Sequence, residues 1–172
     1  MNRRDFSFRL AGAVGALSLG NSRLGAAAFG EVVQGNAALR VNGDRINQHL
    51  TALSEFGKNP YGGVSRVAYS EFDKQGRTYV MGLMREAGLE TSIDVAGNII
   101  GKRAGSNPSL KPLLFGSHID SVPDGGNYDG DVGVLSSIEV ARTFREKGIT
   151  TRHPIEVVIG RASCRERVYH PV

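Results

Sequence analysis

Apolar residues recur at helical spacing in three stretches of this chain, residues 44–57, 70–88 and 131–148. Such spacing places the apolar side chains on one face of a helix, and that face packs against the rest of the domain. Three amphipathic helices are therefore predicted. Their inward-facing residues are expected to be Ile46, Leu50, Leu53 and Phe56; then Phe72, Tyr79, Val80, Leu83, Met84 and Ala87; then Val134, Leu135, Ile138, Val140, Ala141 and Phe144.

Polar residues and glycines at the ends of these stretches supply helix boundaries. Asp44 can cap the first helix and Gly57 can end it. Ser70 opens the sequence Ser-Glu-Phe-Asp, which resembles a capping box at the start of the second helix. Gly88 and Gly148 follow the last apolar positions of the second and third helices, where glycine commonly ends a helix.

Four shorter segments carry strand signals. A hairpin is predicted from strands at 90–94 and 98–103, joined by a turn at Gly97-Asn98. Residues 112–117 are apolar enough for a buried strand, and a further strand begins at 154–158. Strands and helices in this order favour an α/β fold, in which reactive side chains usually lie at the carboxyl ends of the strands.

Composition fits a single globular domain, with 172 residues of which 40% are hydrophobic and 22% are charged. The net charge of +4 would favour an anionic partner, but the basic residues are concentrated at the two ends. Residues 1–28 carry four arginines against one aspartate, and residues 159–172 carry three arginines against one glutamate. The 130 residues between them hold 14 basic and 15 acidic side chains and no tryptophan, so no nucleic-acid partner is predicted.

The first 28 residues resemble a targeting segment. Arg3-Arg4 precede an apolar run rich in glycine and alanine at 10–19, and 26–28 offers three alanines to a signal peptidase. The run is too short to span a bilayer, so no stable membrane anchor is predicted. Paired arginines before such a run are typical of a twin-arginine signal, which would export the protein to the periplasm or beyond. An ordinary amphipathic helix is the alternative, although each glycine would weaken it by about 1 kcal/mol.

The last 14 residues resemble a sequence of another origin. Residues 159–168 match the translation of a common short-read sequencing adapter at ten consecutive positions. We therefore expect the natural reading frame to be interrupted at or just before Ile159, and residues 159–172 to be a non-native tail. A genuine basic tail is the alternative. Cys164, the single cysteine of the chain, lies in this segment, so no intrachain disulfide can form.

Candidate chemistry gathers after the third predicted strand. His118 and Asp120 are two residues apart, so in an extended chain their side chains point to the same face. Asp129 follows in a glycine-rich loop just before the third helix. Each has a structural alternative, as a packed histidine or as a carboxylate that caps a turn or a helix, while Asp124 and Asp131 are expected to be solvated carboxylates. Together, the ordered set favours a metal site in which His118 is a ligand.

The motifs that hold these residues are similar to those of a known enzyme family. Residues 116–123, GSHIDSVP, and 125–135, GGNYDGDVGVL, resemble the zinc-site segment of the M20 metallopeptidase-type amidohydrolases. Residues 62–70, GGVSRVAYS, and 94–101, DVAGNIIG, resemble the hydantoinase/carbamoylase branch of that family. This branch hydrolyses N-carbamoyl-amino acids, ureidopropionate or allantoate.

The resemblance covers about 46–158 and implies a fold and a site. The fold would be α/β, with residues 29–158 forming the N-terminal part of a zinc-exopeptidase-like catalytic domain, a mixed sheet flanked by helices. His118 would bind one zinc, Asp129 would bridge two, and Asp120 would act in catalysis by orienting His118. The complete enzyme would be a homodimer that uses metal-activated water to cleave C–N bonds of small ureido or amide substrates, with two Zn²⁺ per site, or Mn²⁺, Co²⁺ or Ni²⁺.

Several parts of the family's site have no counterpart in this sequence. The family takes its general base and a further ligand from two adjacent glutamates after the strand that starts here at Ile155, where this chain has Gly-Arg-Ala at 160–162. Its later histidine ligands and substrate-binding arginine are expected in a second half, and His49, His153 and His170 match no ligand position. We therefore expect the chain itself to be inactive and to bind zinc weakly. An M20 aminopeptidase or dipeptidase, or a non-catalytic exported binding domain, is the alternative.

Overall fold

The computed structural model describes residues 39–161, so the predicted signal segment and nearly all of the predicted tail, including Cys164 and His170, lie outside the described residues. The elements are α3 (Gly43–Ser54), α4 (Glu71–Glu86), β1 (Glu90–Ile93), β2 (Ile99–Arg103), β3 (Leu113–His118), α5 (Asp131–Glu146) and β4 (Ile155–Gly160). The three predicted helices and four predicted strands are thus present. Within the described residues, no helix is long and apolar enough to cross a membrane.

The four strands form one mixed sheet in the order β1-β2-β4-β3. β1 and β2 are antiparallel and form the predicted hairpin, and β2 is also antiparallel to β4. β3 and β4 run parallel, from Leu113 opposite Ile155 to His118 opposite Gly160. The predicted α/β class and mixed sheet are therefore confirmed. The parallel pair brings the carboxyl ends of β3 and β4 to the same end of the sheet, where His118 lies.

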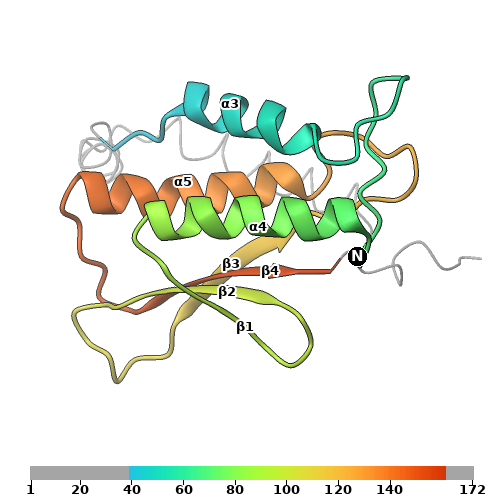
Figure 1. Ribbon diagram of the computed structural model, residues 1–172. Coiled ribbons are helices and arrows are strands. Elements are labelled where there is room, and N and C mark those ends of the chain that lie inside the picture. Colours follow the sequence, from blue (N-terminus) through green and yellow to red (C-terminus); the bar gives the residue numbers. More distant parts are fainter. Residues whose placement is uncertain (1–38, 162–172) are drawn as a thin grey trace, which may run out of the picture. The chain divides into compact units, whose positions relative to one another are not determined.

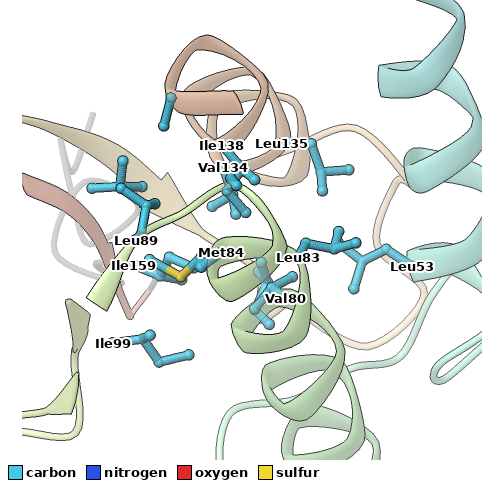
Figure 2. Packing of buried hydrophobic residues seen from close by; sticks show 14 of the residues in the cluster. Leu53, Val80, Leu83, Met84, Leu89, Ile99, Val134, Leu135, Ile138 and Ile159 are labelled. Atoms are coloured by element: carbon cyan, nitrogen blue, oxygen red, sulfur yellow. The ribbon is translucent and has the colours of Figure 1, made fainter. Parts of the chain in front are cut away.

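The three helices lie on one face of the sheet (Figure 1), with α4 and α5 against the strands and α3 packed against α5. Figure 2 shows Met84 pointing from α4 toward Ile99 and Ile159 of the strands. Gly101 makes this close approach possible, because a Cβ there would lie 2.4 Å from the Met84 Cε. The buried core residues are Leu50, Leu53, Val80, Leu83, Met84, Ala87, Leu89, Ile99, Ile119, Val134, Leu135, Ile138, Ala141, Ile155, Val157 and Ile159.

The cap of α3 is Asn42 rather than Asp44. The side-chain oxygen of Asn42 accepts a hydrogen bond of 3.0 Å from the backbone N–H of Arg45. Asp44 lies inside the first turn, where a negative charge favours the positive end of the helix dipole. The prediction was wrong because Asn and Asp are equally good caps, and the apolar pattern does not distinguish the two positions.

The start of α4 is as predicted, but one of its expected core residues is not buried. The Ser70 hydroxyl oxygen accepts a bond of 3.2 Å from the backbone N–H of Asp73. Phe72, however, is 49% exposed. The buried face passes through Asp73, Gly76 and Val80, and Phe72 lies about 100° around the helix from Asp73.

β3 is not the buried strand that its apolar sequence predicted. Leu113 and Leu114 are 53% and 62% exposed, because β3 is at the edge of the described sheet. β4 lies between two strands instead, and its residues Ile155, Val157 and Ile159 are buried. Ile159 is the first residue of the predicted non-native tail; its place in β4 does not test where that segment comes from.

Candidate metal site

His118 is the last residue of β3 and presents its imidazole at the carboxyl end of the sheet. Its Nδ1 lies 3.0 Å from the backbone carbonyl oxygen of Asp120. Because a carbonyl oxygen can only accept, Nδ1 carries a hydrogen, and in the neutral imidazole this leaves the lone pair on Nε2. His118 is therefore held in the tautomer in which Nε2 can bind a metal ion.

Asp120 holds this ring through its main chain. The carboxylate Oδ1 lies 3.9 Å from Nδ1 of His118, beyond hydrogen-bond distance, and the Asp120 side chain is buried. The expected orientation of His118 by Asp120 thus has its geometric counterpart in the Asp120 carbonyl group. A catalytic role for the carboxylate stays a prediction.

Asp129 lies in the loop before α5, and Gly130 determines how closely that loop approaches His118. Gly130 has a φ of +74°, in the left-handed region. A Cβ at this position would lie 2.6 Å from Cε1 and 2.7 Å from Nδ1 of His118. Glycine therefore lets the backbone lie directly against the imidazole. Since Asp129 immediately precedes Gly130, both predicted ligands belong to this end of the sheet.

Asp131 is buried, in contrast to the solvated carboxylate expected from the sequence. Its side chain is almost inaccessible, and Oδ2 accepts a bond of 2.5 Å from Nη2 of Arg66. Burial raises the pKa of Asp131 to about 6, and the Arg66 guanidinium opposes that rise. Electrostatic interactions with His118 and Asp129 also affect the pKa of Asp131, so this carboxylate lies within electrostatic range of both predicted ligands.

The segment 62–66 pairs with the loop that follows β3. Val64 and Gly125 exchange both backbone hydrogen bonds, each of 2.9 Å. The Ser121 N–H donates to the Arg66 carbonyl oxygen, and the Ser121 hydroxyl oxygen accepts from the Arg66 N–H, both at 2.9 Å. The motif at 62–70 thus contacts the motif at 116–123, although Arg66 and Ser121 are 55 positions apart.

The carboxyl end of β4 carries a cation where the family resemblance implies a glutamate pair. Arg161 follows the strand, and its Nη1 donates to the buried carboxylate of Asp73. The guanidinium also lies 4.3 Å from the centre of the Tyr69 ring. A guanidinium has no acceptor and stays charged in proteins, so Arg161 can serve neither as a base nor as a metal ligand.

The other two described histidines lie outside this cluster, as expected. Nδ1 of His49 is 2.8 Å from the Tyr79 hydroxyl, between α3 and α4, and burial lowers the pKa of His49. Nδ1 of His153 is 2.8 Å from the carbonyl oxygen of Lys111. Neither contact involves a candidate ligand.

His118 and Asp129 fit part of a metal site. A neutral imidazole with an available nitrogen and a carboxylate are both ligands that zinc prefers. Among residues 39–161, however, no group of three or more His, Cys, Asp or Glu side chains could hold a metal ion. Because an open catalytic zinc site uses three protein ligands, the described residues supply a portion of such a site.

Comparison with known proteins shows which enzymes this chain is related to. A model of Peptidase family M28 matches residues 98–162. The N-carbamoyl-L-amino acid amidohydrolase of Geobacillus stearothermophilus is 47% identical over 118 residues, which are 69% of this chain and 29% of that protein. An amidase of the hydantoinase/carbamoylase family from Burkholderia multivorans has a solved structure that matches with a TM-score of 0.69 and 42% identity, over 71% of this chain and 30% of that one. This chain is thus a homologue of hydantoinase/carbamoylase amidases over the part that it shares with them.

These homologues confirm the predicted branch. The allantoate amidohydrolase of Bacillus subtilis is a more distant relative, 32% identical over 66% of this chain and 27% of its own length. Assignment to M20 stays a prediction, since the matching family model is that of M28, which is consistent with a peptidase-like fold. This chain spans less than a third of the length of the relatives named here.

Proposed function

We propose that this chain is part of a metal-dependent amidohydrolase that cleaves C–N bonds of N-carbamoyl amino acids or related ureido acids. The observation that carries the proposal is the arrangement of His118, whose Nδ1 is held by the Asp120 carbonyl oxygen so that Nε2 retains its lone pair. The names of the relatives, N-carbamoyl-L-amino acid amidohydrolase and allantoate amidohydrolase, support the substrate class.

In this proposal the chain contributes two ligands of a zinc pair. His118 would bind through Nε2 and Asp129 through its carboxylate, with Mn²⁺, Co²⁺ or Ni²⁺ as alternative ions. When bound, the metal pair supplies Lewis-acid activation of water and of the substrate carbonyl. The chain's own part is orientation: the Asp120 carbonyl group fixes the ring of His118, and Gly130 keeps the Asp129 loop against it.

The 172-residue chain itself is expected to be inactive and to bind zinc weakly. Two ligands do not complete a catalytic zinc site, and Arg161 stands where the family resemblance implies a base. Calorimetric titration of the chain with Zn²⁺ should therefore show weak binding. Two tight sites would contradict this expectation.

A substrate panel tests the proposed activity on the protein encoded by the uninterrupted gene. After chelation and reloading with Zn²⁺, it should hydrolyse N-carbamoyl-L-amino acids faster than dipeptides, and the chelated protein should be inactive. A preference for dipeptides would favour an aminopeptidase or dipeptidase. No hydrolysis after reloading would favour a non-catalytic binding domain.

We also propose that residues 1–28 direct export through the twin-arginine route, supported by Arg3-Arg4 before the apolar run. An Arg3→Lys/Arg4→Lys variant should remain in the cytoplasm on cell fractionation, and continued export of this variant would contradict the proposal.

The second proposal is that residues 159–172 are a non-native tail. Long-read sequencing of the gene tests it, and a natural codon run through Cys164 would contradict it.

A further inference from the structure

Arg66 is a buried arginine that contacts three separate segments of the chain. Its side chain is 1% exposed. Nε donates to the carbonyl oxygen of Ile119 at 2.6 Å, and Nη2 donates to Asp131 at 2.5 Å. Nη1 donates to the carbonyl oxygens of Leu53 at 2.7 Å and Phe56 at 3.0 Å. One guanidinium thus joins the end of α3, the loop after β3 and the start of α5.

Two of these three segments carry the predicted metal ligands. Ile119 lies between His118 and Asp120, and Asp131 lies two residues after Asp129. Because one rigid, planar group bonds to both segments, its position determines the separation between them. The bonds to Ile119 and Asp131 would act on a metal through the backbone of these two loops.

Arg66 is itself held firmly. Its backbone N–H and carbonyl oxygen both bond to Ser121, at 2.9 Å each. On the other side, α4 lies against the side chain at Gly76, where a Cβ would be 2.9 Å from the Arg66 Cδ. A buried ion pair adds little net stability, because desolvation of the two charges offsets their attraction. The contacts therefore indicate a role in placing the loops more than a role in overall stability.

We propose that Arg66 is the positioning residue of the metal site, and that its guanidinium sets the separation between the His118 loop and the Asp129 loop. The link to a metal rests on the proposed function, whereas the placement of the loops is a property of the chain without metal. A lysine at this position would keep the positive charge beside Asp131 but would lack the planar fork of donors.

Amide hydrogen exchange in the full chain tests this placement without metal or activity. The amides of Ser121 and Val134 report on the two loops, since they donate to the carbonyl oxygens of Arg66 and Gly130. In Arg66→Lys we expect their protection to fall at least tenfold, while protection along the β2–β4 ladder changes less than twofold. Arg103→Lys is the matched control, because Arg103 bonds to a backbone carbonyl oxygen at the opposite end of the sheet; it should leave both amides unchanged.

Unchanged protection of Ser121 and Val134 in Arg66→Lys would overturn the proposal, and so would an equal loss throughout the ladder, which would indicate a purely structural role. Should Arg66→Lys fail to fold, the Asp131→Asn variant takes its place. Its asparagine side chain keeps an oxygen that can accept from Arg66 but lacks the negative charge of the carboxylate. The same selective loss is then expected at Val134, and its absence would overturn the proposal.

Titration with Zn²⁺ alone separates this proposal from the proposed function. The protein from the uninterrupted gene should bind zinc at least tenfold more tightly than its Arg66→Lys variant. If that protein binds no zinc but the exchange result holds, the proposed function loses its support while the placement of the loops by Arg66 stands. If the two proteins bind zinc equally, the positioning role is overturned and the proposed function stands.

Discussion

At Gly130, a hydrogen in place of a side chain lets the start of α5 lie against the His118 imidazole. Its φ is +74°, and a Cβ would lie 2.4 Å from the His118 carbonyl oxygen. Gly130→Ala is therefore expected to lower the free energy of unfolding by about 1–2 kcal/mol from the left-handed backbone alone, and to displace the ring. Urea unfolding measures the first effect, and the NMR signals of the His118 ring report the second.

Gly126, in the same loop, is the matched control for this substitution. A Cβ there would meet no atom within 4 Å, and its φ is outside the left-handed region. Gly126→Ala is expected to change the free energy of unfolding by less than about 1 kcal/mol and to leave the His118 ring signals in place. Equal effects of the two substitutions would contradict the proposed contact between Gly130 and the ring.

The sequence was sufficient to single out His118, Asp120 and Asp129 as candidates, but it did not reveal the residue that joins their loops. Arg66 is the one charged residue in the segment 62–70, and this is the only feature of the nearby sequence that distinguishes it. Its partners Ile119 and Asp131 are 53 and 65 positions away. Hydrophobic periodicity describes neighbours within a few turns or strand residues, so it contains no information on such contacts.

At the scale of elements, α3 and α5 are joined by a partly buried ion pair. Arg45 donates through Nη2 and Nε to Glu139, at 2.7 and 2.8 Å, and the Glu139 side chain is only 3% exposed. Arg45→Met is expected to lower the free energy of unfolding by about 3 kcal/mol, because it leaves a buried carboxylate unpaired. Lys58→Met, which removes an exposed pair with Glu55, should change it by less than about 1 kcal/mol. Urea unfolding distinguishes the two, and similar small effects would contradict the role of Arg45.

The β1–β2 turn is held by Asp94. Its carboxylate accepts from the Asn98 side chain at 2.8 Å and from the backbone N–H groups of Asn98 and Ala96 at 2.9 Å. These bonds, the Asn98 side chain first, lower the pKa of Asp94. Its contribution to stability is therefore complete above the unfolded pKa of about 3.9 and is lost as pH falls through the lower folded pKa. The free energy of unfolding should depend less steeply on pH below about 4 in Asp94→Asn; an unchanged dependence would contradict this.

The start of α4 and the β1–β2 turn could be predicted from residue spacing and capping residues, whereas the exposure of β3 could not. The helix from Ser70 and the hairpin turn before Ile99 depend on nearby residues, which the sequence displays directly. The exposure of Leu113 and Leu114 depends on which strands pair with β3, and β4 follows β3 only after a whole helix. An apolar strand sequence is compatible with either place in a sheet.

At the scale of the whole molecule, the edge position of β3 in the sheet that residues 39–161 form predicts self-association. An apolar edge strand offers unpaired backbone groups to another chain. Leu114→Lys is expected to reduce concentration-dependent association in sedimentation velocity. Val95→Lys is the control, because Val95 is fully exposed in the β1–β2 turn and not on that edge. Equal reduction by both would indicate general charge repulsion instead of pairing through β3.

The central claim is that His118 belongs to the metal site of an amidohydrolase. It is tested most directly by steady-state hydrolysis of an N-carbamoyl-L-amino acid by the zinc-loaded protein from the uninterrupted gene, with and without His118→Ala. We predict hydrolysis by the wild-type protein and a loss in kcat/KM of about 100-fold or more in the variant, since even the partners of metal ligands contribute 10–100-fold. No hydrolysis by the wild-type protein, or equal activity of the two, would contradict the claim.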